Sequence, residues 1–534
     1  MLEALLLLWF GPTRSVPLAP QVVAPAPYGV FHDLRWLLVY HSSWWAFVVE
    51  VALMLAFRSC LDTLLVRAAW PARAPLPAWR AQLEQVARFT AVQAIVLLPF
   101  AVLAFAMAVT SLSWLFFVFV PVALIAALVM HHGSIERGWW RNAPTRASAL
   151  AALGAFGVIT LGGAAIAVAP PWLRPLLAAG AGVTLAWFRL RIVEAVVDRD
   201  VSPRRRPFAV VCLVAVFALV IGGTAIGFAV SVAVQNGRTP VPEASASAHG
   251  PPVLIVKGFN SEWEGITRRW VRGGPRGGFT FRRFSYAGLD SVGQPRPYGR
   301  SETHQSLRAL AREMRVQVRA FHDATGEPVN IVAESEGALV AQAYLAGTPH
   351  APVRSIVLLS PLLAPGRVHY PRIGDNGWGT AGGAVLDGLS AVVGAVGPVD
   401  VSSDTPLFRA IVDEEPAVGD LIRCPPPGVR SFAVLPLDSG VSVPAPFAIG
   451  YRYAVVPAFH GGLLGDATSA DLLRHVLLGE HASGSGFWST VADVVNAGAA
   501  AWQAPSLEPS LEPAWHADGN GCRAVRAEMR RYLR

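Results

Sequence analysis

The sequence predicts a bundle of about six membrane-spanning α-helices followed by an α/β domain with a mostly parallel sheet. Hydrophobic residues make up 53% of the 534 positions and charged residues only 15%, a balance far from that of soluble proteins. Long apolar runs crowd the first 235 positions, whereas the rest of the chain alternates short apolar strands with helical stretches. Strand-helix alternation favours a parallel sheet.

Six apolar runs predict the spans, because a spanning helix needs about 20 apolar residues that satisfy their own backbone hydrogen bonds in lipid. The runs are residues 36–57, 90–109, 113–130, 147–169, 172–190 and 208–234. The first is the weakest, since His41 and Glu50 interrupt it. Glu50 is open to two interpretations: a functional ionisable group, or a side chain that faces a partner helix or the interface. No second intramembrane charge is evident as its partner, which weighs against a transporter.

Arginines predict the orientation of these spans, because short loops rich in Lys and Arg tend to stay in the cytoplasm. They gather after the first, third and fifth spans: Arg58, Arg67, Arg73, Arg80 and Arg88, then Arg137, Arg141 and Arg146, then Arg189, Arg191, Arg199, Arg204, Arg205 and Arg206. The chain beyond residue 235 is therefore expected outside the cytoplasm. This placement also explains the net charge of +8 without a nucleic-acid partner.

The chain divides by composition into four parts. We expect a multi-pass transmembrane domain over residues 1–235, a linker over 236–252, an α/β domain over 253–480 and a tail over 481–534. Glycine-rich residues 361–430 are expected to form a cap insert. Cys424 and Cys522 allow one disulfide in the globular half, and two free thiols are an equal alternative. No cluster predicts a metal or haem site, and no cofactor is expected.

Short apolar runs predict the strands of the sheet: residues 253–256, 279–284, 329–333, 355–360, 432–437 and 453–456. After the third run, Ser335 stands between small residues and before an apolar helix. A serine at such a tight turn requires small flanking residues; Gly337 meets this need, and Ala333 replaces the usual glycine on the other side. The alternative is a serine that caps the helix.

Partners for a serine nucleophile follow in the order acid, histidine. Asp438 ends one predicted strand, and His460 follows the last one, so both are expected at the carboxyl edge of the sheet with Ser335. Asp404 and Asp413 in the insert are alternative acids. His304 and His475 are alternative histidines, the second expected to face solvent.

These motifs resemble the α/β-hydrolase superfamily, in particular its bacterial lipases and esterases, over residues 251–480. The resemblance implies a hydrolase fold with a cap insert, in which Ser335 is the nucleophile, His460 the general base and Asp438 the acid that orients it. It also implies that the amides of Phe259 and Glu336 form an oxyanion hole. Two further stretches, 284–288 and 399–407, resemble family segments. Lys257 stands where lipases often have histidine.

Glu334 and Glu336 flank the serine, and two interpretations stay open. They either raise the basicity of the histidine and repel anionic substrates, or they are solvated acids that match the helix dipole. The sequence thus predicts a membrane-anchored serine esterase or lipase acting on an acyl ester or lipid at the extracytoplasmic face. The alternatives are a catalytically inactive hydrolase-like domain that binds a partner or envelope component and, less favoured, a transporter.

Overall fold

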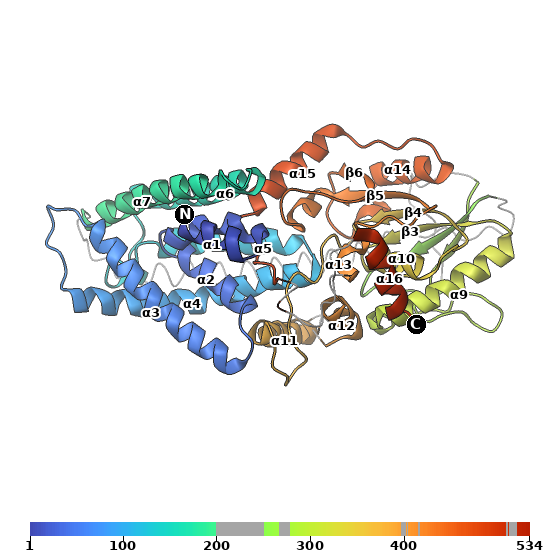
Figure 1. Ribbon diagram of the computed structural model, residues 1–534, viewed down its shortest axis with the longest axis horizontal. Helices are drawn as coiled ribbons and strands as arrows, with labels where there is room; N and C mark the ends of the chain where they lie inside the picture. The colour runs from blue at the N-terminus through green and yellow to red at the C-terminus, as the bar shows by residue number, and fades with distance from the viewer. Residues whose placement is uncertain are drawn as a thin grey trace.

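The computed structural model describes residues 1–198, 250–265, 278–396, 402, 404–414, 417–508, 511 and 521–534. The molecule is elongated, with a helical region at one end and an α/β region at the other (Figure 1). The sixth predicted span and most of the predicted linker lie outside the described residues.

Within the part of the helical region that the structure describes, three helices are long and apolar enough to cross a membrane, which suggests that the protein associates with one. They are α4 (Trp79–Thr110), α6 (Arg146–Val168) and α7 (Arg174–Val197). Helix α5 (Trp114–Met130) is apolar but has only 17 residues. The region also contains helices α1 (Leu2–Phe10), α2 (Tyr28–Val39) and α3 (Trp44–Ala68) and the 3-10 segments η1 (Thr13–Val23) and η2 (Trp139–Arg141).

The first predicted span has the wrong limits. The chain breaks between α2 and α3, because the Ser43 side chain accepts a hydrogen bond from the Ala46 N–H and so caps the start of α3. Helix α3 also continues for eleven residues past the predicted end and carries Arg58, Asp62 and Arg67. It is consequently not among the helices apolar enough to span.

Two arginines that we assigned to cytoplasmic loops are buried in ion pairs instead. Arg58 donates to both carboxylate oxygens of Asp33, at 2.8 and 2.6 Å, and Arg189 lies 3.2 Å from Asp62. The expectation that the helical region holds no pair of buried charges was therefore wrong. Glu50, by contrast, is half-buried on α3.

These arginines also bind the backbone of the segment that precedes α2. Arg58 donates to the Val22 carbonyl at 2.7 Å, and Arg189 donates to the Ala24 carbonyl, also at 2.7 Å. Buried carbonyls outside a regular helix need such donors, because lipid and apolar side chains offer none. The pairs therefore stabilise the end of the 3-10 segment η1 and its C-cap residue inside the helical region.

The α/β region is built on a six-stranded sheet in the order β2-β1-β3-β4-β5-β6, with every neighbouring pair parallel. The strands are β1 (Pro252–Val256), β2 (Thr280–Arg283), β3 (Val329–Glu334), β4 (Val353–Leu359), β5 (Arg430–Pro436) and β6 (Arg452–Val456). The prediction of a mostly parallel sheet is confirmed. Because β2 and β3 flank β1 on opposite sides, the connections diverge at the carboxyl ends of β1 and β3, the position where sites of parallel sheets are usually found.

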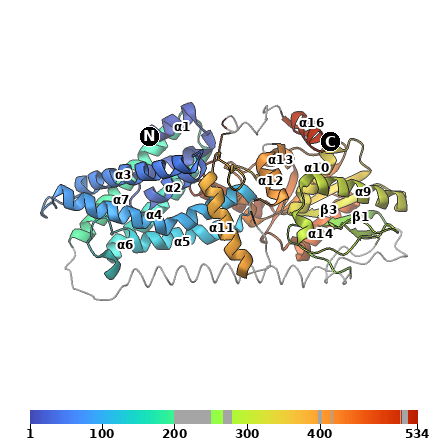
Figure 2. The ribbon, with the colours of Figure 1, turned by 90° about the horizontal axis from the view of Figure 1, so that it is seen from below.

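Helices cover both faces of the sheet, as its continuous apolar strands require. Figure 2 shows α9 (Leu307–Thr325) and α10 (Glu336–Gly347) on one face and α14 (Ala467–Leu478) on the other. Successive residues of a strand point to opposite faces of the sheet and so belong to two separate cores. Leu254, for example, packs with α9 and α10, and Val253 packs with α14.

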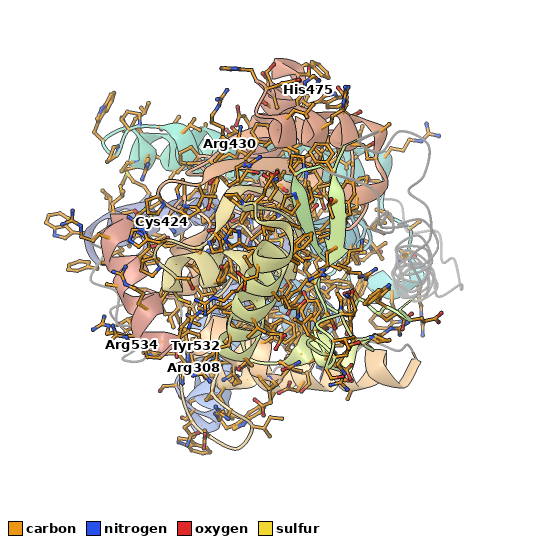
Figure 3. The ribbon with its side chains drawn as sticks, turned by 90° about the vertical axis from the view of Figure 1, so that its right-hand side faces the viewer. Arg308, Cys424, Arg430, His475, Tyr532 and Arg534 are labelled. Atoms are coloured by element: carbon orange, nitrogen blue, oxygen red, sulfur yellow. A yellow bond between two sulfur atoms is a disulfide. The ribbon has the colours of Figure 1, made fainter. Side chains whose placement is uncertain are left out.

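The predicted insert and tail both contain helices. The insert holds α11 (Thr380–Val396), α12 (Pro406–Asp413) and α13 (Ala417–Leu421), and the tail holds α15 (Gly486–Ala499) and α16 (Gly521–Tyr532). A disulfide joins Cys424 to Cys522 at the start of α16, with Cα atoms 5.2 Å apart. At the other end of α16, Arg308 stacks over the ring of Tyr532 (Figure 3).

Candidate active site

Ser335 occupies the turn between β3 and α10 in a strained conformation. Its φ of 56° and ψ of −120° lie in a region that non-glycine residues occupy at a cost of about 1–3 kcal/mol. The surrounding chain fixes this turn: the Ser335 N–H donates to the Leu359 carbonyl at 2.9 Å. A Cβ on Gly337 would lie 2.7 Å from the Lys257 carbonyl, so a glycine is required there, whereas Ala333 on the other flank is accommodated in the core.

His460 lies within hydrogen-bond distance of this serine. Its Nε2 is 2.8 Å from the Ser335 Oγ, across 125 residues of sequence. The loop after β6 carries the histidine to the carboxyl edge of the sheet, where parallel strands bring their ends together. Burial lowers the pKa of His460 from 6.5, against the charges of Asp438 and Glu334, which raise it. The imidazole is therefore neutral at pH 7 and able to accept a proton.

Asp438 is close to His460 but does not bond to its ring. It follows β5 in the 3-10 turn η4 (Leu437–Val441) and is fully buried. Burial raises its pKa above 3.8, opposed by the charge and backbone N–H of His460 and by the Ser113 hydroxyl. Ser113 Oγ donates to its Oδ2 at 2.8 Å, while its Oδ1 has no hydrogen-bond partner among the described residues.

Ser113 was not among the residues that the sequence indicated. It lies at the start of α5, at the edge of a predicted membrane span, 325 positions from Asp438. A single serine at the end of an apolar run is common and carries no chemical pattern, so only the three-dimensional structure reveals this contact.

The two predicted oxyanion amides lie on either side of Ser335. Gly258 comes so close that a Cβ on it would lie 2.8 Å from the Ser335 Cβ, and Phe259 follows directly. The Phe259 N–H has no acceptor among the described residues. The Glu336 N–H is the first of α10, where helical N–H groups lack partners within the helix. Both donors are thus available to an oxygen next to Ser335.

The interpretation of Glu334 and Glu336 as solvated acids was wrong, because both are buried. Glu334 forms a buried ion pair with Lys257, at 2.9 Å between Nζ and Oε2. Glu336 has no hydrogen-bond partner for either carboxyl oxygen in the described part of the chain. Burial raises its pKa well above 4.5, which favours the protonated form of this group. Lys257 is the sole lysine of the chain. Its ion pair with Glu334 joins the carboxyl ends of β1 and β3.

The alternative acids and histidines lie elsewhere. Asp404 and Asp413 both pair with Arg409. His475 is exposed on α14 and contacts Glu480, at the edge of the molecule in Figure 3. His304 is closer to the site: its ring stacks on Phe259 at 4.5 Å between centroids, and its Nε2 is 2.6 Å from the Asn260 side chain.

Helix α11 of the insert packs against the helical region, whereas α12 and α13 contribute to the core of the α/β region. The Gly379 and Ala381 N–H groups donate to His41, at 2.9 Å to its carbonyl and 2.7 Å to its Nε2. Helix α12 approaches the candidate site, where Phe408 contacts Phe259 at 5.4 Å between ring centroids. In the described residues, then, the insert connects the two regions and covers one side of the β1 end.

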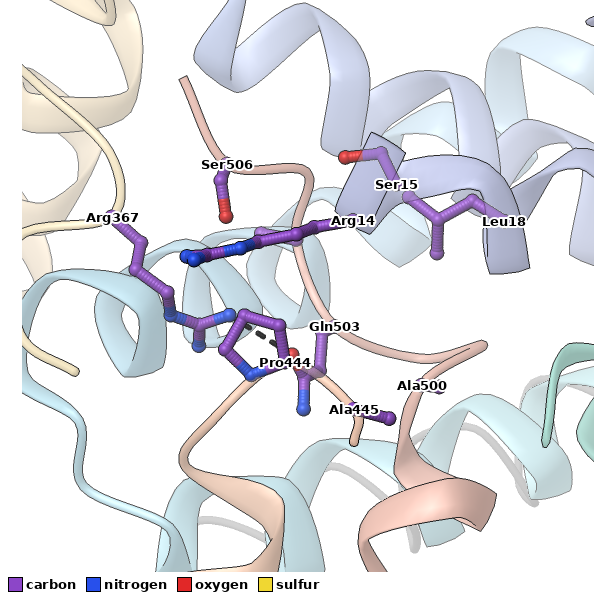
Figure 4. A pocket seen from close by; sticks show the side chains of 10 residues that line it. Arg14, Ser15, Leu18, Arg367, Pro444, Ala445, Ala500, Gln503 and Ser506 are labelled. Carbon is purple, nitrogen blue, oxygen red and sulfur yellow. Dashed lines mark hydrogen bonds between the residues drawn. The ribbon is translucent and has the colours of Figure 1, made fainter. Parts of the chain in front are cut away.

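A small polar pocket lies at another part of this junction, apart from Ser335 (Figure 4). Arg14 of η1 and Arg367 of the insert point into it, and Arg367 Nη1 donates to the Gln503 Oε1 at 2.9 Å. The pocket marks where the tail passes between the two regions. No group of side chains suited to hold a metal ion is found in the described residues.

Neither the scan of protein-family models nor the search of curated proteins found a match to this chain.

Proposed function

We propose that this protein is a membrane-bound serine hydrolase of the α/β-hydrolase type that cleaves an acyl ester. The observation that carries the proposal is the 2.8 Å contact between Ser335 Oγ and His460 Nε2 at a turn strained to present the serine. A nucleophile paired with a neutral imidazole is the arrangement that acyl transfer requires.

In the proposed reaction, His460 accepts the hydroxyl proton as Ser335 Oγ attacks the ester carbonyl. The carbonyl oxygen becomes an oxyanion, stabilised by the N–H groups of Phe259 and Glu336. The protonated imidazole then donates its proton to the leaving alcohol as the carbon–oxygen bond breaks. Water attacks the acyl-enzyme by the same route in reverse, which releases the acid and restores Ser335.

The surroundings of His460 support an apolar substrate. Phe459 is 64% exposed and Phe117 of α5 is 45% exposed, and their rings meet edge to face with centroids 6.1 Å apart. An acyl chain that lies against these rings would bury apolar area that is otherwise exposed to water, beside the imidazole. The proposed substrate is accordingly a lipid or another acyl ester drawn from the membrane surface.

The arrangement of the helical region supports a multi-pass protein with its α/β region outside the cytoplasm. Val66 and Val193 pack with Ile135, which brings the arginine-rich ends of α3 and α7 and the loop after α5 together. The exposed pair of Arg73 and Asp198 lies at that end, and Ser113 meets the α/β region at the other. Arginine-rich ends tend to remain in the cytoplasm, and the disulfide suits an oxidising compartment.

The proposal is tested with the full-length protein in detergent or nanodiscs. Hydrolysis of p-nitrophenyl esters of increasing chain length is expected for the wild type, and Ser335→Ala is expected to lower it at least about a thousandfold. A Ser335→Ala variant that keeps wild-type activity would remove this serine from the reaction. The lack of a bond between Asp438 and the His460 ring favours the second candidate, an inactive hydrolase-like binding protein. Absence of turnover by the folded wild type with every ester would support that candidate.

A further inference from the structure

The loop between α4 and α5 joins the helical region to the candidate site. Helix α4 ends at Thr110, and the next residue, Ser111, has a left-handed φ of 57° that turns the chain sharply. Leu112 then packs against both the core of the helical region and the core of the α/β region. Ser113 follows, 1% exposed, with its hydroxyl 2.8 Å from the carboxylate of Asp438.

Backbone hydrogen bonds fix this loop to the segment that follows β4. The Gly366 N–H donates to the Val109 carbonyl at 2.8 Å, and the Arg367 N–H donates to the Ala108 carbonyl at 3.1 Å. The Ala364 N–H donates to the Ser111 hydroxyl at 3.3 Å. These hydrogen bonds fix the position of the end of α4 relative to the α/β region. They therefore hold Ser113 beside Asp438.

The tail strengthens the same junction. The ring of Trp502 is inserted into the helical region, stacked on Phe156 at 4.7 Å, and its Nε1 donates to Thr160 at 3.0 Å. Gln503 Nε2 donates to the carbonyls of Val441 and Val443, at 3.0 and 2.9 Å, in the segment that begins with Asp438. The segment that carries the acid is thus held from the helical side by several independent contacts.

A buried carboxylate needs hydrogen-bond donors to stay charged and correctly oriented. Ser113 is the side-chain donor that Asp438 has among the described residues, and Oδ1 is left without a partner. From these contacts we infer that Ser113 is a positioning residue: it fixes the carboxylate of Asp438 toward His460, so the helical region completes the active site. This inference rests on the proposed function.

The consequence is that the α4–α5 loop is part of the esterase and not only its anchor. In Ser113→Ala the carboxylate loses its hydroxyl donor while His460, Glu334 and Lys257 remain. Because the Ser113 bond lowers the pKa of Asp438, its loss raises that pKa. The carboxylate then becomes protonated at a higher pH, and the acidic limb of the kcat/KM profile moves upward.

Three variants of the full-length protein test this role, with ester hydrolysis measured from pH 4 to 9. Ser113→Ala is expected to lower kcat about tenfold, as for the loss of a hydrogen bond to a charged group, with KM within about twofold and the acidic limb at higher pH. Ser113→Thr keeps the hydroxyl and is expected to restore both kcat and the limb. Ser111→Ala removes a neighbouring hydroxyl that contacts Ala364 and is expected to leave the limb unchanged.

Two results would overturn the inference. One is a Ser113→Ala enzyme with wild-type kcat and an unmoved acidic limb. The other is an equal loss and equal limb position in Ser113→Ala and Ser111→Ala, which would assign the effect to docking of the two regions. A wild-type protein that hydrolyses no ester would refute the proposed function itself, so the two failures are distinguishable. Thermal unfolding of each variant in the same detergent checks that it is folded.

Discussion

The buried charge pairs of the helical region and two buried acids of the candidate site, Asp438 and Glu336, are surrounded differently. A third acid of the site, Glu334, pairs with Lys257 as the charges of the helical region do. In the helical region, Arg58 and Arg189 each contact a carboxylate and backbone carbonyls. In the α/β region, Asp438 keeps one oxygen, and Glu336 both oxygens, without a hydrogen-bond partner in the described chain. Glu336 lies directly beside Ser335, and Asp438 lies beside His460.

This difference separates stabilising charges from candidate functional ones. Paired and hydrogen-bonded charges offset much of their desolvation, so they hold irregular backbone in place without implying chemistry. Buried acids with unmet acceptors destabilise the fold, as does the strained φ of Ser335. Proteins retain such destabilising features mainly where a functional site requires them. The contrast therefore favours catalysis in the α/β region and a structural role for the charge pairs of the helical region.

The largest expected effect separates Asp438 from Asp404, one of the two alternative acids. Asp438→Asn removes the charge that supports a protonated His460 and is expected to lower kcat by about a thousandfold or more. The control is Asp404→Asn, since Asp404 pairs with Arg409 away from the histidine. It is expected to keep kcat within about threefold. A loss of kcat larger than threefold in Asp404→Asn, measured by the same ester assay, would assign the role of the acid to Asp404 in the insert.

An intermediate effect is expected in the helical region. Arg58→Met leaves the half-buried Asp33 with His32 as its remaining partner and is expected to lower the free energy of unfolding by about 3 kcal/mol. Arg73→Met breaks a pair whose side chains are 63% and 44% exposed and is expected to cost under about 1 kcal/mol. Denaturant titration in detergent measures both. Equal, small losses would show that the buried pairs do not stabilise this region.

The smallest expected effect concerns strain at the nucleophile. Ser335→Gly relieves the positive φ and is expected to raise the free energy of unfolding of the inactive protein by about 1 kcal/mol relative to Ser335→Ala. Both variants lose the bond to His460, so the difference isolates the backbone. If the glycine variant is no more stable than the alanine variant, the turn is not strained in solution.

The sequence predicted the α/β region better than the helical region, and the reasons are physical. The short apolar runs became strands because most of their residues are buried in the sheet, although β2 at its edge is only partly buried. Chain order alone placed Ser335, Asp438 and His460 after strands that end at one edge. The limits of α3 were missed because a hydropathy pattern cannot distinguish a loop arginine from one paired with a distant carboxylate, as in Arg58 with Asp33.

Contacts between the two regions could not be predicted at all. The Ser113 hydroxyl meets Asp438 only because α4, the segment after β4 and the Trp502 segment dock together, and no local periodicity encodes that docking.

The burial of Glu334 and Glu336 was likewise missed, since the pattern of a helix start gives no sign of the Lys257 ammonium at the end of β1.

The most direct test of this account is to identify the residue that a fluorophosphonate modifies. Full-length protein is treated with the probe, digested and mapped by mass spectrometry, beside His460→Ala and a lipase as a labelling control. The account predicts one adduct, on Ser335, formed far more slowly in His460→Ala. An adduct on a different serine, or none under conditions that label the lipase, would contradict the claim that Ser335 and His460 form the active site.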